Sequence, residues 1–117
     1  MLIVDDNLDA GSSLALLLEI AGHQTSRAHD GPSALDAAET ERPEVILLDI
    51  GLPTLNGYEV CRRIRKQPWG SSVLVIALTG WGQEEDRRRS HEAGFDGHLV
   101  KPVEYAELMT LLGRLQT

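Results

Sequence analysis

The stretch Val45-Ile46-Leu47-Leu48-Asp49 decides the fold of this chain, because four consecutive apolar residues run into a carboxylate. A short apolar run without alternating polar positions is typical of a strand that is buried on both faces of a parallel sheet. The functional loops of an open parallel sheet lie at the carboxyl ends of its strands. Asp49 therefore stands, on a rigid strand, where such a sheet carries its chemistry.

Around this strand, short apolar segments alternate with segments of helical periodicity. The first five segments are expected at Leu2–Val4, Leu8–Ala21, Gln24–Ala28, Pro32–Glu41 and Val45–Leu48, and a last helix at Glu104–Leu115. This alternation predicts an α/β fold with five strands and five helices around a parallel sheet. The 117 residues are expected to form one domain, residues 1–117. The first strand is short, so the natural chain is expected to begin earlier.

Two helices carry an apolar stripe that we expect in the core. The stripe of the first helix is formed by Leu14, Leu17, Leu18 and Ala21, and that of the last helix by Leu108, Leu111, Leu112 and Leu115. The first helix is expected to stop at Gly22. The basic residues Arg62, Arg63, Arg65 and Lys66 close the third helix, and we interpret them as complementing the helix dipole and keeping the surface soluble.

Composition and charge exclude several classes of protein. The sequence is 42% hydrophobic and 25% charged, and its apolar runs are far shorter than the roughly 20 residues of a membrane span. A formal net charge of −7 argues against direct binding of nucleic acid, which needs a basic surface. The single cysteine, Cys61, excludes an internal disulfide and a zinc site. We expect a cytoplasmic domain without membrane contact.

Five polar residues follow the predicted strands at their carboxyl ends: Asp5, Asp6, Asp49, Thr79 and Lys101. A single aspartate at such a place is often only a helix cap or a turn former. Three carboxylates in one crevice, however, repel each other by several kcal/mol unless a cation or a shared proton relieves them. Mg²⁺ accepts carboxylate and phosphate oxygens, so the pattern indicates a magnesium site.

Lysine and threonine at the same edge suit phosphoryl transfer. Lys101 can pair with Asp49 before the reaction and with a phosphoryl oxygen afterwards, while Thr79 can donate a hydrogen bond to another such oxygen. Catalysis of phosphoryl transfer consists mainly of positioning and of electrostatic stabilisation. Asp49 is the best candidate for the nucleophile because it closes the buried strand.

Five motifs in this chain resemble, in order and in spacing, those of response-regulator receiver domains. They are Val4-Asp5-Asp6-Asn7, Leu47-Leu48-Asp49-Ile50-Gly51-Leu52-Pro53, Asn56-Gly57-Tyr58-Glu59, Ala77-Leu78-Thr79-Gly80 and Leu99-Val100-Lys101-Pro102. The resemblance covers nearly all of the chain. It implies a flavodoxin-like three-layer sandwich with a five-stranded parallel sheet of order 2-1-3-4-5. It also implies a cis peptide bond between Lys101 and Pro102, which would aim the lysine into the site.

The same resemblance implies the function of the site. Asp49 would be phosphorylated, Asp6 and Asp49 would bind Mg²⁺ directly, Asp5 would act mainly through water, and the carbonyl oxygen of Gly51 would be a further ligand. The phosphoryl donor would be the phosphohistidine of a histidine kinase or a histidine phosphotransfer domain. Such a domain is a signalling receiver and not an enzyme, although it promotes its own phosphorylation and dephosphorylation.

The output of such a domain would be a change in the surface of the fourth helix, fifth strand and fifth helix, through which two copies could also form a dimer. Further similarities, in Gly94-Phe95-Asp96 and His98-Leu99-Val100-Lys101-Pro102, resemble receivers at the carboxyl end of hybrid sensor kinases. A stand-alone receiver is the alternative.

The chain departs from the family pattern in several places. Asn56 replaces an acidic residue, and its amide can make the same turn. His98 stands where receivers generally carry a Tyr or Phe that moves inward on phosphorylation. It is either an ordinary strand residue or a smaller, titratable switch residue together with Thr79. The expected helix at Glu84–Ala93 has acidic residues first and arginines next, so we expect ion pairs at four-residue spacing on a solvated face or a partner surface.

Gly51 and Trp81 occupy positions that usually modulate the lifetime of the phosphorylated form. Polar side chains two residues after the nucleophile and two after Thr79 help to place the hydrolytic water. Glycine offers no such group, and an indole can cover the approach with apolar surface while offering one donor. We therefore expect slow hydrolysis, unless Trp81 swings outward between its two flanking glycines and shields nothing.

Three other functions use a similar sheet. A magnesium-dependent phosphohydrolase would need a second acid two residues after the nucleophile, where this chain has Gly51. A flavodoxin-like electron carrier would need small hydroxyl and glycine residues where Asp5 and Asp6 stand. The third alternative is an interaction module that works without phosphorylation.

Overall fold

The structure, a computed structural model, describes residues 1–52, 55–80 and 84–115, with only the backbone described for 84–87. Strands and helices alternate along the whole described chain. The strands are β1 (Leu2–Val4), β2 (Ser26–Ala28), β3 (Val45–Asp49), β4 (Leu74–Thr79) and β5 (Gly97–Val100). The helices are α1 (Leu8–Ile20), α2 (Gly31–Glu41), α3 (Gly57–Arg65), α4 (Glu84–Ala93) and α5 (Tyr105–Leu115).

The five strands form one parallel sheet in the order β2-β1-β3-β4-β5, which confirms the predicted topology. β3 is central and pairs with both β1 and β4. The register places Val4 beside Leu48, and Asp49 beside Leu78. The carboxyl ends of β1, β3 and β4 therefore reach the same edge of the sheet.

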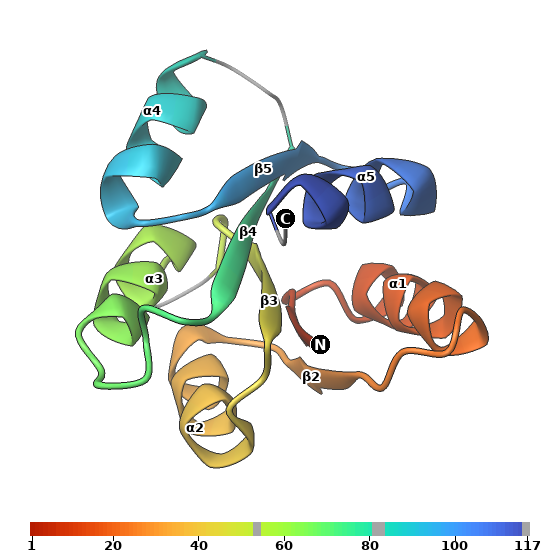
Figure 1. Cartoon of the computed structure of the whole chain (residues 1–117), viewed down its shortest axis with the longest axis horizontal. Coiled ribbons are helices and arrows are strands. Elements are labelled where there is room, and N and C mark those ends of the chain that lie inside the picture. The colour runs from red at the N-terminus through yellow and green to blue at the C-terminus, as the bar shows by residue number, and fades with distance from the viewer. Residues whose placement is uncertain (53–54, 81–83, 116–117) are drawn as a thin grey trace.

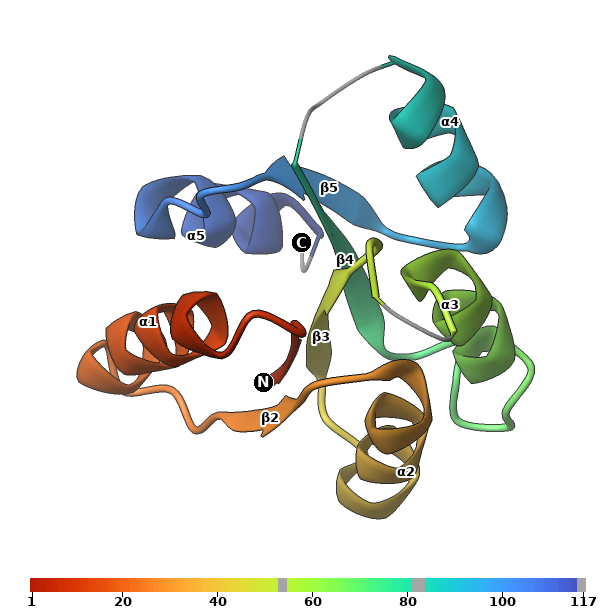
Figure 2. The ribbon, with the colours of Figure 1, turned by 180° about the vertical axis from the view of Figure 1, so that it is seen from behind.

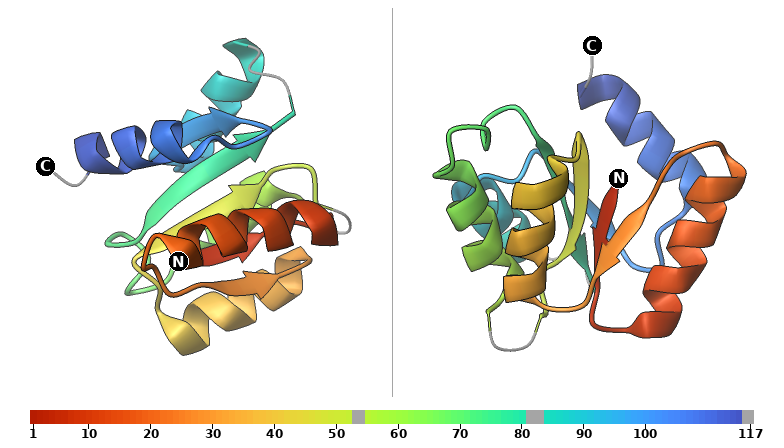
Figure 3. Two further views of the ribbon diagram at one scale, coloured as in Figure 1. Left: turned by 90° about the vertical axis from the view of Figure 1, so that its right-hand side faces the viewer. Right: turned by 90° about the horizontal axis from the view of Figure 1, so that it is seen from below.

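Helices cover both faces of the sheet, so the fold has three layers. In Figure 1, α1 and α5 lie on one side of the strands and α2, α3 and α4 lie on the other. The reverse view in Figure 2 shows the same separation. In the right-hand view of Figure 3 the sheet stands between the α1 and α5 pair and the α2 and α3 pair. This is the flavodoxin-like three-layer sandwich that the resemblance to receiver domains implied.

Alternating residues of the strands build two separate cores, because successive side chains of a strand point to opposite faces. Leu47 packs in the core under α1 and α5, whereas Ile46 and Leu48 pack in the core under α2, α3 and α4. All three side chains are fully buried. The uninterrupted apolar run of β3 thus reflects a strand with a helical layer on each side.

The buried face of α1 differs from the predicted stripe. Leu14 and Leu18 are buried as expected, but Leu17 is 45% exposed and Ala21 is also exposed, so the prediction was wrong for these two. Gly11 and Ala15 take the inward positions instead. The strip that contacts the sheet follows the spacing 11, 14, 15 and 18, which is one narrow face of a helix. The stripe of α5 is buried at Leu108, Leu111 and Leu112, as predicted, and Leu115 is partly buried.

Several element boundaries shift by one or two residues from the prediction. β2 begins at Ser26 and not at Gln24, and α1 ends at Ile20. The backbone of Gly22 has a φ of +96°, and its N–H donates to the carbonyl oxygen of Glu19, so glycine closes the helix as expected. No helix within the described residues is long and apolar enough to cross a membrane.

Candidate functional site

Asp49 ends β3 at the carboxyl edge of the sheet, and its side chain is almost completely enclosed. The residue is 7% exposed. Its Oδ1 accepts a hydrogen bond of 2.8 Å from the backbone N–H of Gly51, and its Oδ2 accepts one of 2.8 Å from Nζ of Lys101. Both oxygens are therefore held in fixed positions by groups of this chain.

Asp5, which follows β1, faces the same lysine. Its Oδ2 lies 3.0 Å from Nζ of Lys101, and its Oδ1 accepts a hydrogen bond of 2.9 Å from the backbone N–H of Asn7. Asn7 in turn caps α1, because its Oδ1 accepts from the N–H of Ala10 at 3.1 Å. Lys101 thus bridges the carboxylates of Asp5 and Asp49 from the end of β5. The peptide bond between Lys101 and Pro102 is cis, as predicted.

Asp6 completes a cluster of three carboxylates. Ligand atoms of Asp5, Asp6 and Asp49 all lie within 4.8 Å of one another, and Asp6 is the exposed member. Two like charges at that distance repel by about 3 kcal/mol at an effective dielectric constant near 20. One lysine cannot balance three carboxylates, so the cluster favours a cation.

Burial and charge act on the titration of the pair in opposite directions. Burial raises the pKa of the Asp49 carboxyl, and the hydrogen bonds from Lys101 and Gly51 offset this only in part. Burial also acts to lower the pKa of the Lys101 ammonium, but its hydrogen bonds to Asp49 and Asp5 outweigh burial and raise it. The raised pKa favours the charged form of Lys101, which places a positive charge beside the enclosed carboxylate of Asp49.

Thr79 and His98 contact each other beside this pair. Thr79 ends β4 and is 2% exposed, and its Oγ1 lies 3.0 Å from Nε2 of His98 on β5. The histidine side chain is partly buried and is directed toward the threonine. Of the two interpretations of His98, this geometry favours the one in which the ring is connected to the site.

In the loop after Asp49, the structure shows what Asn56 does and how much space there is at Gly51 and Gly57. The Oδ1 atom of Asn56 accepts a hydrogen bond of 3.1 Å from the N–H of Glu59, so the amide caps α3 as an acid would. A Cβ atom on Gly57 would lie 2.5 Å from Cα of Ile50, which only glycine avoids. A Cβ on Gly51 would meet Oδ1 of Asp49 at 3.4 Å, an ordinary contact, so this exposed position has room for a side chain.

Two predictions fall outside the part of the chain that the structure describes. Trp81 lies outside the described residues, and so do the side chains of Glu84 and Glu85, which were expected to pair with Arg88 and Arg89.

The guanidinium carbon of Arg89 lies 4.4 Å from the ring centre of Tyr58, a cation–π contact between α4 and α3.

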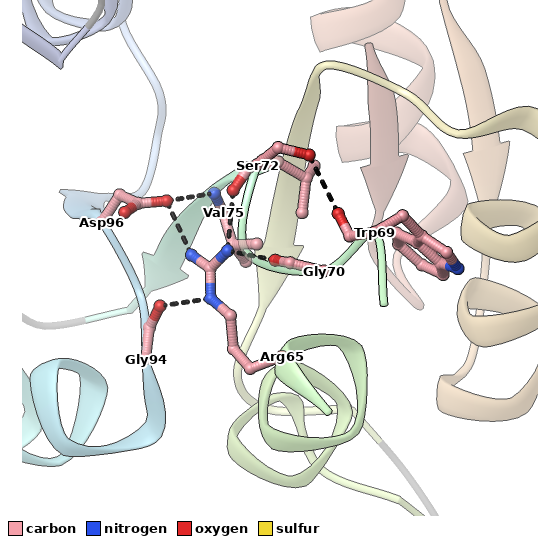
Figure 4. A network of polar contacts seen from close by, with 8 residues as sticks. Arg65, Trp69, Gly70, Ser72, Val75, Gly94 and Asp96 are labelled. Carbon is pink, nitrogen blue, oxygen red and sulfur yellow. Dashed lines mark hydrogen bonds and ion pairs between the residues drawn. The ribbon is translucent and has the colours of Figure 1, made fainter. Parts of the chain in front are cut away.

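Arg65 has a structural role that the sequence did not reveal. The sequence grouped it with the solvated arginines of α3, and this is right for Arg62 and Arg63, which pair with Glu59. Figure 4 shows that the guanidinium of Arg65 instead binds the chain at four points. It donates to the carbonyl oxygens of Gly70, Val73 and Gly94 and to the carboxylate of Asp96. No sequence pattern could have separated it from its neighbours.

The buried carboxylate, the lysine that bridges it to a second acid, and the acidic cluster lie together in one crevice at the carboxyl edge of a doubly wound sheet. The model of the response regulator receiver domain family matches residues 1–113, and the chain belongs to that family. It is therefore a receiver domain of the kind found in two-component response regulators.

Known proteins resemble the chain over most of its length. An uncharacterized 14.6 kDa protein of Leptolyngbya boryana is 36% identical over 96% of this chain and 86% of its own length. The response regulator MprA of Mycobacterium avium is 35% identical over 98% of this chain and 50% of its own length. The chain thus spans about half the length of that regulator.

Solved structures agree with this assignment. The receiver domain of the sensor histidine kinase PA1611 from Pseudomonas aeruginosa, solved with a magnesium ion coordinated in its active-site cleft, has a TM-score of 0.89 and 36% identity, with 99% of this chain and 96% of that chain covered. The chemotaxis protein CheY4 of Vibrio cholerae has a TM-score of 0.91 and 30% identity, with 97% of this chain and 95% of that chain covered.

Proposed function

We propose that residues 1–117 form one phosphoacceptor receiver, in which Asp49 accepts a phosphoryl group from a phosphohistidine of a histidine kinase or a phosphotransfer protein. The observation that carries this proposal is the position of Lys101, whose Nζ lies 2.8 Å from Asp49 and 3.0 Å from Asp5. The charged Lys101 pairs with an oxygen of Asp49 before the transfer. It can then pair with an oxygen of the phosphoryl group that Asp49 has accepted.

The donor set of the acidic cluster fits a magnesium ion. Its three carboxylates offer hard oxygen ligands within 4.8 Å of one another, and one exposed member leaves room for water and for a phosphate oxygen. We assign Asp6 and Asp49 as direct ligands, Asp5 as a ligand through water and the Gly51 carbonyl as a further ligand. The ion would neutralise charge that develops on the phosphoryl oxygens.

The residues of this chain supply positioning for the transfer. An oxygen of Asp49 forms the new bond to phosphorus as the bond from phosphorus to the imidazole nitrogen of the donor breaks, and that nitrogen keeps the electron pair. Gly51 holds Oδ1 of Asp49 through its N–H, which fixes the plane of the carboxylate. Lys101 then pairs with a phosphoryl oxygen, and Thr79 donates its hydroxyl hydrogen to another.

Thr79 and His98 form the switch in this proposal. A threonine hydroxyl has only one hydrogen to donate, so a bond from Thr79 to a phosphoryl oxygen changes its bond to His98. The ring of His98 lies on β5 between α4 and α5 and transmits that change to the α4-β5-α5 surface. The receiver would in this way convert phosphorylation into a different surface for its partner.

We also propose that the acyl phosphate hydrolyses slowly in the absence of a partner. Gly51 offers no side chain to orient a water in line with the phosphorus, although the structure has room for one. Gly51→Asn should therefore shorten the lifetime of the phosphorylated form, as should Trp81→Glu at the position outside the described residues. Unchanged or slower decay in both variants would contradict this part of the proposal.

The function is tested by incubating the protein with acetyl phosphate and Mg²⁺ and measuring its intact mass. We expect one added phosphoryl group that is labile in base and that peptide mapping places on Asp49. Asp49→Asn should abolish the modification. Asp36→Asn, which removes a carboxylate of the same kind from the exposed face of α2, should be modified like the wild type. Normal modification of Asp49→Asn would refute the assignment.

A further inference from the structure

A pocket of about 500 Å³ lies at the amino ends of the strands, away from the acidic cluster. In the right-hand view of Figure 3, the amino terminus, the turn between α1 and β2 and the second half of α5 lie toward the same end of the molecule. Each of these segments contributes to the pocket a residue whose side chain can bind a metal: Met1, His23 and Met109. The fold therefore brings two methionines and a histidine from distant parts of the sequence to one pocket.

The donor atoms of these three residues are soft or borderline ligands. A thioether sulfur suits copper(I), and an imidazole nitrogen suits copper and zinc, whereas Mg²⁺ and Ca²⁺ prefer oxygen. The chain has two methionines among its 117 residues, and both line this pocket. The domain thus has hard carboxylate oxygens at one end of its sheet and soft donors at the other.

The three side chains have the freedom that coordination of a metal requires. All three residues are partly buried, and both methionines pack on the edge of the core under α1 and α5. Methionine is unbranched and has three rotatable bonds, so its sulfur can move without a change in the backbone. The imidazole of His23 makes no hydrogen bond or ion pair with the residues that the structure describes. A ring nitrogen of His23 is therefore available to a metal.

The charges near the pocket favour a cation. Glu44 lines the pocket, and both Glu44 and Glu41 lie near enough to the Met1 ammonium to favour its charged form. The ammonium itself is held by the carbonyl oxygen of Gln24, to which it donates a hydrogen bond of 2.7 Å. The formal net charge of −7 attracts cations to the domain as a whole. A monovalent ion in the pocket would lie beside a carboxylate that balances its charge.

We propose that this pocket binds one copper(I) ion through the Sδ atoms of Met1 and Met109 and a ring nitrogen of His23. Zinc fits less well, because its protein ligands are thiolates, imidazoles and carboxylates and not thioethers. The thiol of Cys61 is a further soft donor, but it is fully buried in the core on the other face of the sheet. The site uses no residue of the acidic cluster, so this inference does not rest on the proposed function.

Binding of the ion should also stabilise the fold. Met1 precedes β1, His23 follows α1, and Met109 lies within α5, so a shared ion would link three segments that are separate in the unfolded chain. A ligand that binds only the folded state raises its stability by mass action. We therefore expect thermal unfolding to shift to a higher temperature when copper(I) is added in the absence of oxygen.

Nuclear magnetic resonance of protein labelled with ¹³C in its methionine methyl groups tests the proposal. Because the chain has two methionines, the spectrum contains two methyl signals, and each reports on one proposed ligand. On titration with copper(I) in the absence of oxygen, we expect both signals to shift and to saturate at one equivalent. Competition with a coloured copper(I) chelator measures the affinity, which Met109→Leu and His23→Gln should each weaken at least tenfold. His91→Gln, which removes an exposed histidine of α4, should change it less than twofold.

Several results would overturn the proposal. They are methyl signals that do not shift, a shift of only one signal, and an equal loss of affinity in His91→Gln. Copper(I) bound by Cys61 would leave both methyl signals in place and would be lost in Cys61→Ala. Tighter binding of Zn²⁺ than of copper(I) would also contradict a thioether site. Thermal unfolding without copper shows whether each variant is folded, and Met109→Leu keeps most of the apolar volume of the side chain.

Saturating Mg²⁺ separates this site from the proposed magnesium site. It should leave both methyl signals and the copper(I) affinity unchanged, because the two sites share no residue. Competition between the two ions would overturn the copper(I) site as described. Copper(I) binding in Asp49→Asn should equal that of the wild type, so a failure of the proposed phosphorylation and a failure of this inference are distinguishable.

Discussion

Two clusters of aspartate with a basic residue lie at opposite ends of the strands in this domain, and they differ in how their charges balance. At the amino ends of β4 and β5, Arg65 pairs with Asp96 and also binds three backbone carbonyl oxygens (Figure 4). At the carboxyl ends, Lys101 faces both Asp5 and Asp49. Asp6 adds a third acid to this second cluster, which leaves an excess of negative charge.

The two clusters therefore differ in whether they can take part in chemistry. Four of the five N–H donors of Arg65 bind acceptors of this chain, so the cluster holds α3 against the turn before β5. Lys101 is a single point charge shared between two acids, which leaves an excess of negative charge that suits the cation and the phosphoryl group of the proposed function. We expect substitutions in the first cluster to change stability and substitutions in the second to change phosphorylation.

The largest expected effect comes from Lys101→Met. Removing a charge that stabilises the transferring group should slow phosphorylation of Asp49 about 100-fold, the usual effect of losing one such donor. The measurement is the rate of mass increase with acetyl phosphate at saturating Mg²⁺. Lys66→Met, which removes an exposed lysine at the end of α3, is the matched control and should react at the wild-type rate.

Magnesium should stabilise the domain, because the ion relieves repulsion in the folded state alone. At a concentration 100 times the dissociation constant the gain is about 2.7 kcal/mol. Thermal unfolding with increasing Mg²⁺ measures it. Asp6→Asn should lose most of the response, and Asp36→Asn should keep it. A wild-type melting temperature that did not respond to millimolar Mg²⁺ would contradict a cation site in the acidic cluster.

Arg65→Met should lower the free energy of unfolding by about 2 kcal/mol, because it leaves Asp96 and the carbonyl oxygens without their donor. Chemical denaturation measures the loss. Arg63→Met, one of the solvated arginines of α3, should cost less than about 0.5 kcal/mol. If Arg65→Met instead slowed phosphorylation of the folded protein as much as Lys101→Met, the assignment of stability to one cluster and phosphorylation to the other would be wrong.

The smallest effect concerns Cys61, which is buried beside Arg65. Burial raises the pKa of its thiol to about 11, from an ordinary value of 9.0, although Arg65 acts to lower it. The raised pKa means that this thiol contributes stability below pH 9, which is lost as the pH rises through 11. At pH 8 we expect the native thiol to react slowly with a disulfide reagent. Arg65→Met should speed the reaction by raising the unfolded population, and Arg63→Met should not.

Most of the fold and the list of candidate residues could be predicted from the amino-acid sequence. The apolar run that ends in Asp49 predicted a strand that is covered on both faces. The alternation of such strand segments with helical segments predicted a parallel sheet. Parallel strands share one carboxyl edge, so Asp5, Asp49, Thr79 and Lys101 were expected to lie together before any coordinate was known. These inferences depend on backbone geometry that every parallel sheet shares.

The pairing of the polar side chains, in contrast, depends on how the helices pack on the sheet. Arg65 and Arg63 have the same chemistry and lie on the same helix, yet one is bound at four points and the other is solvated. The sequence pattern could not predict the contact of His98 with Thr79 or the exposure of Leu17 either. A local sequence pattern predicts whether a segment forms a helix or a strand. A contact between two side chains depends instead on the distance between segments that are far apart in the sequence. That distance is set when the helices pack on the sheet.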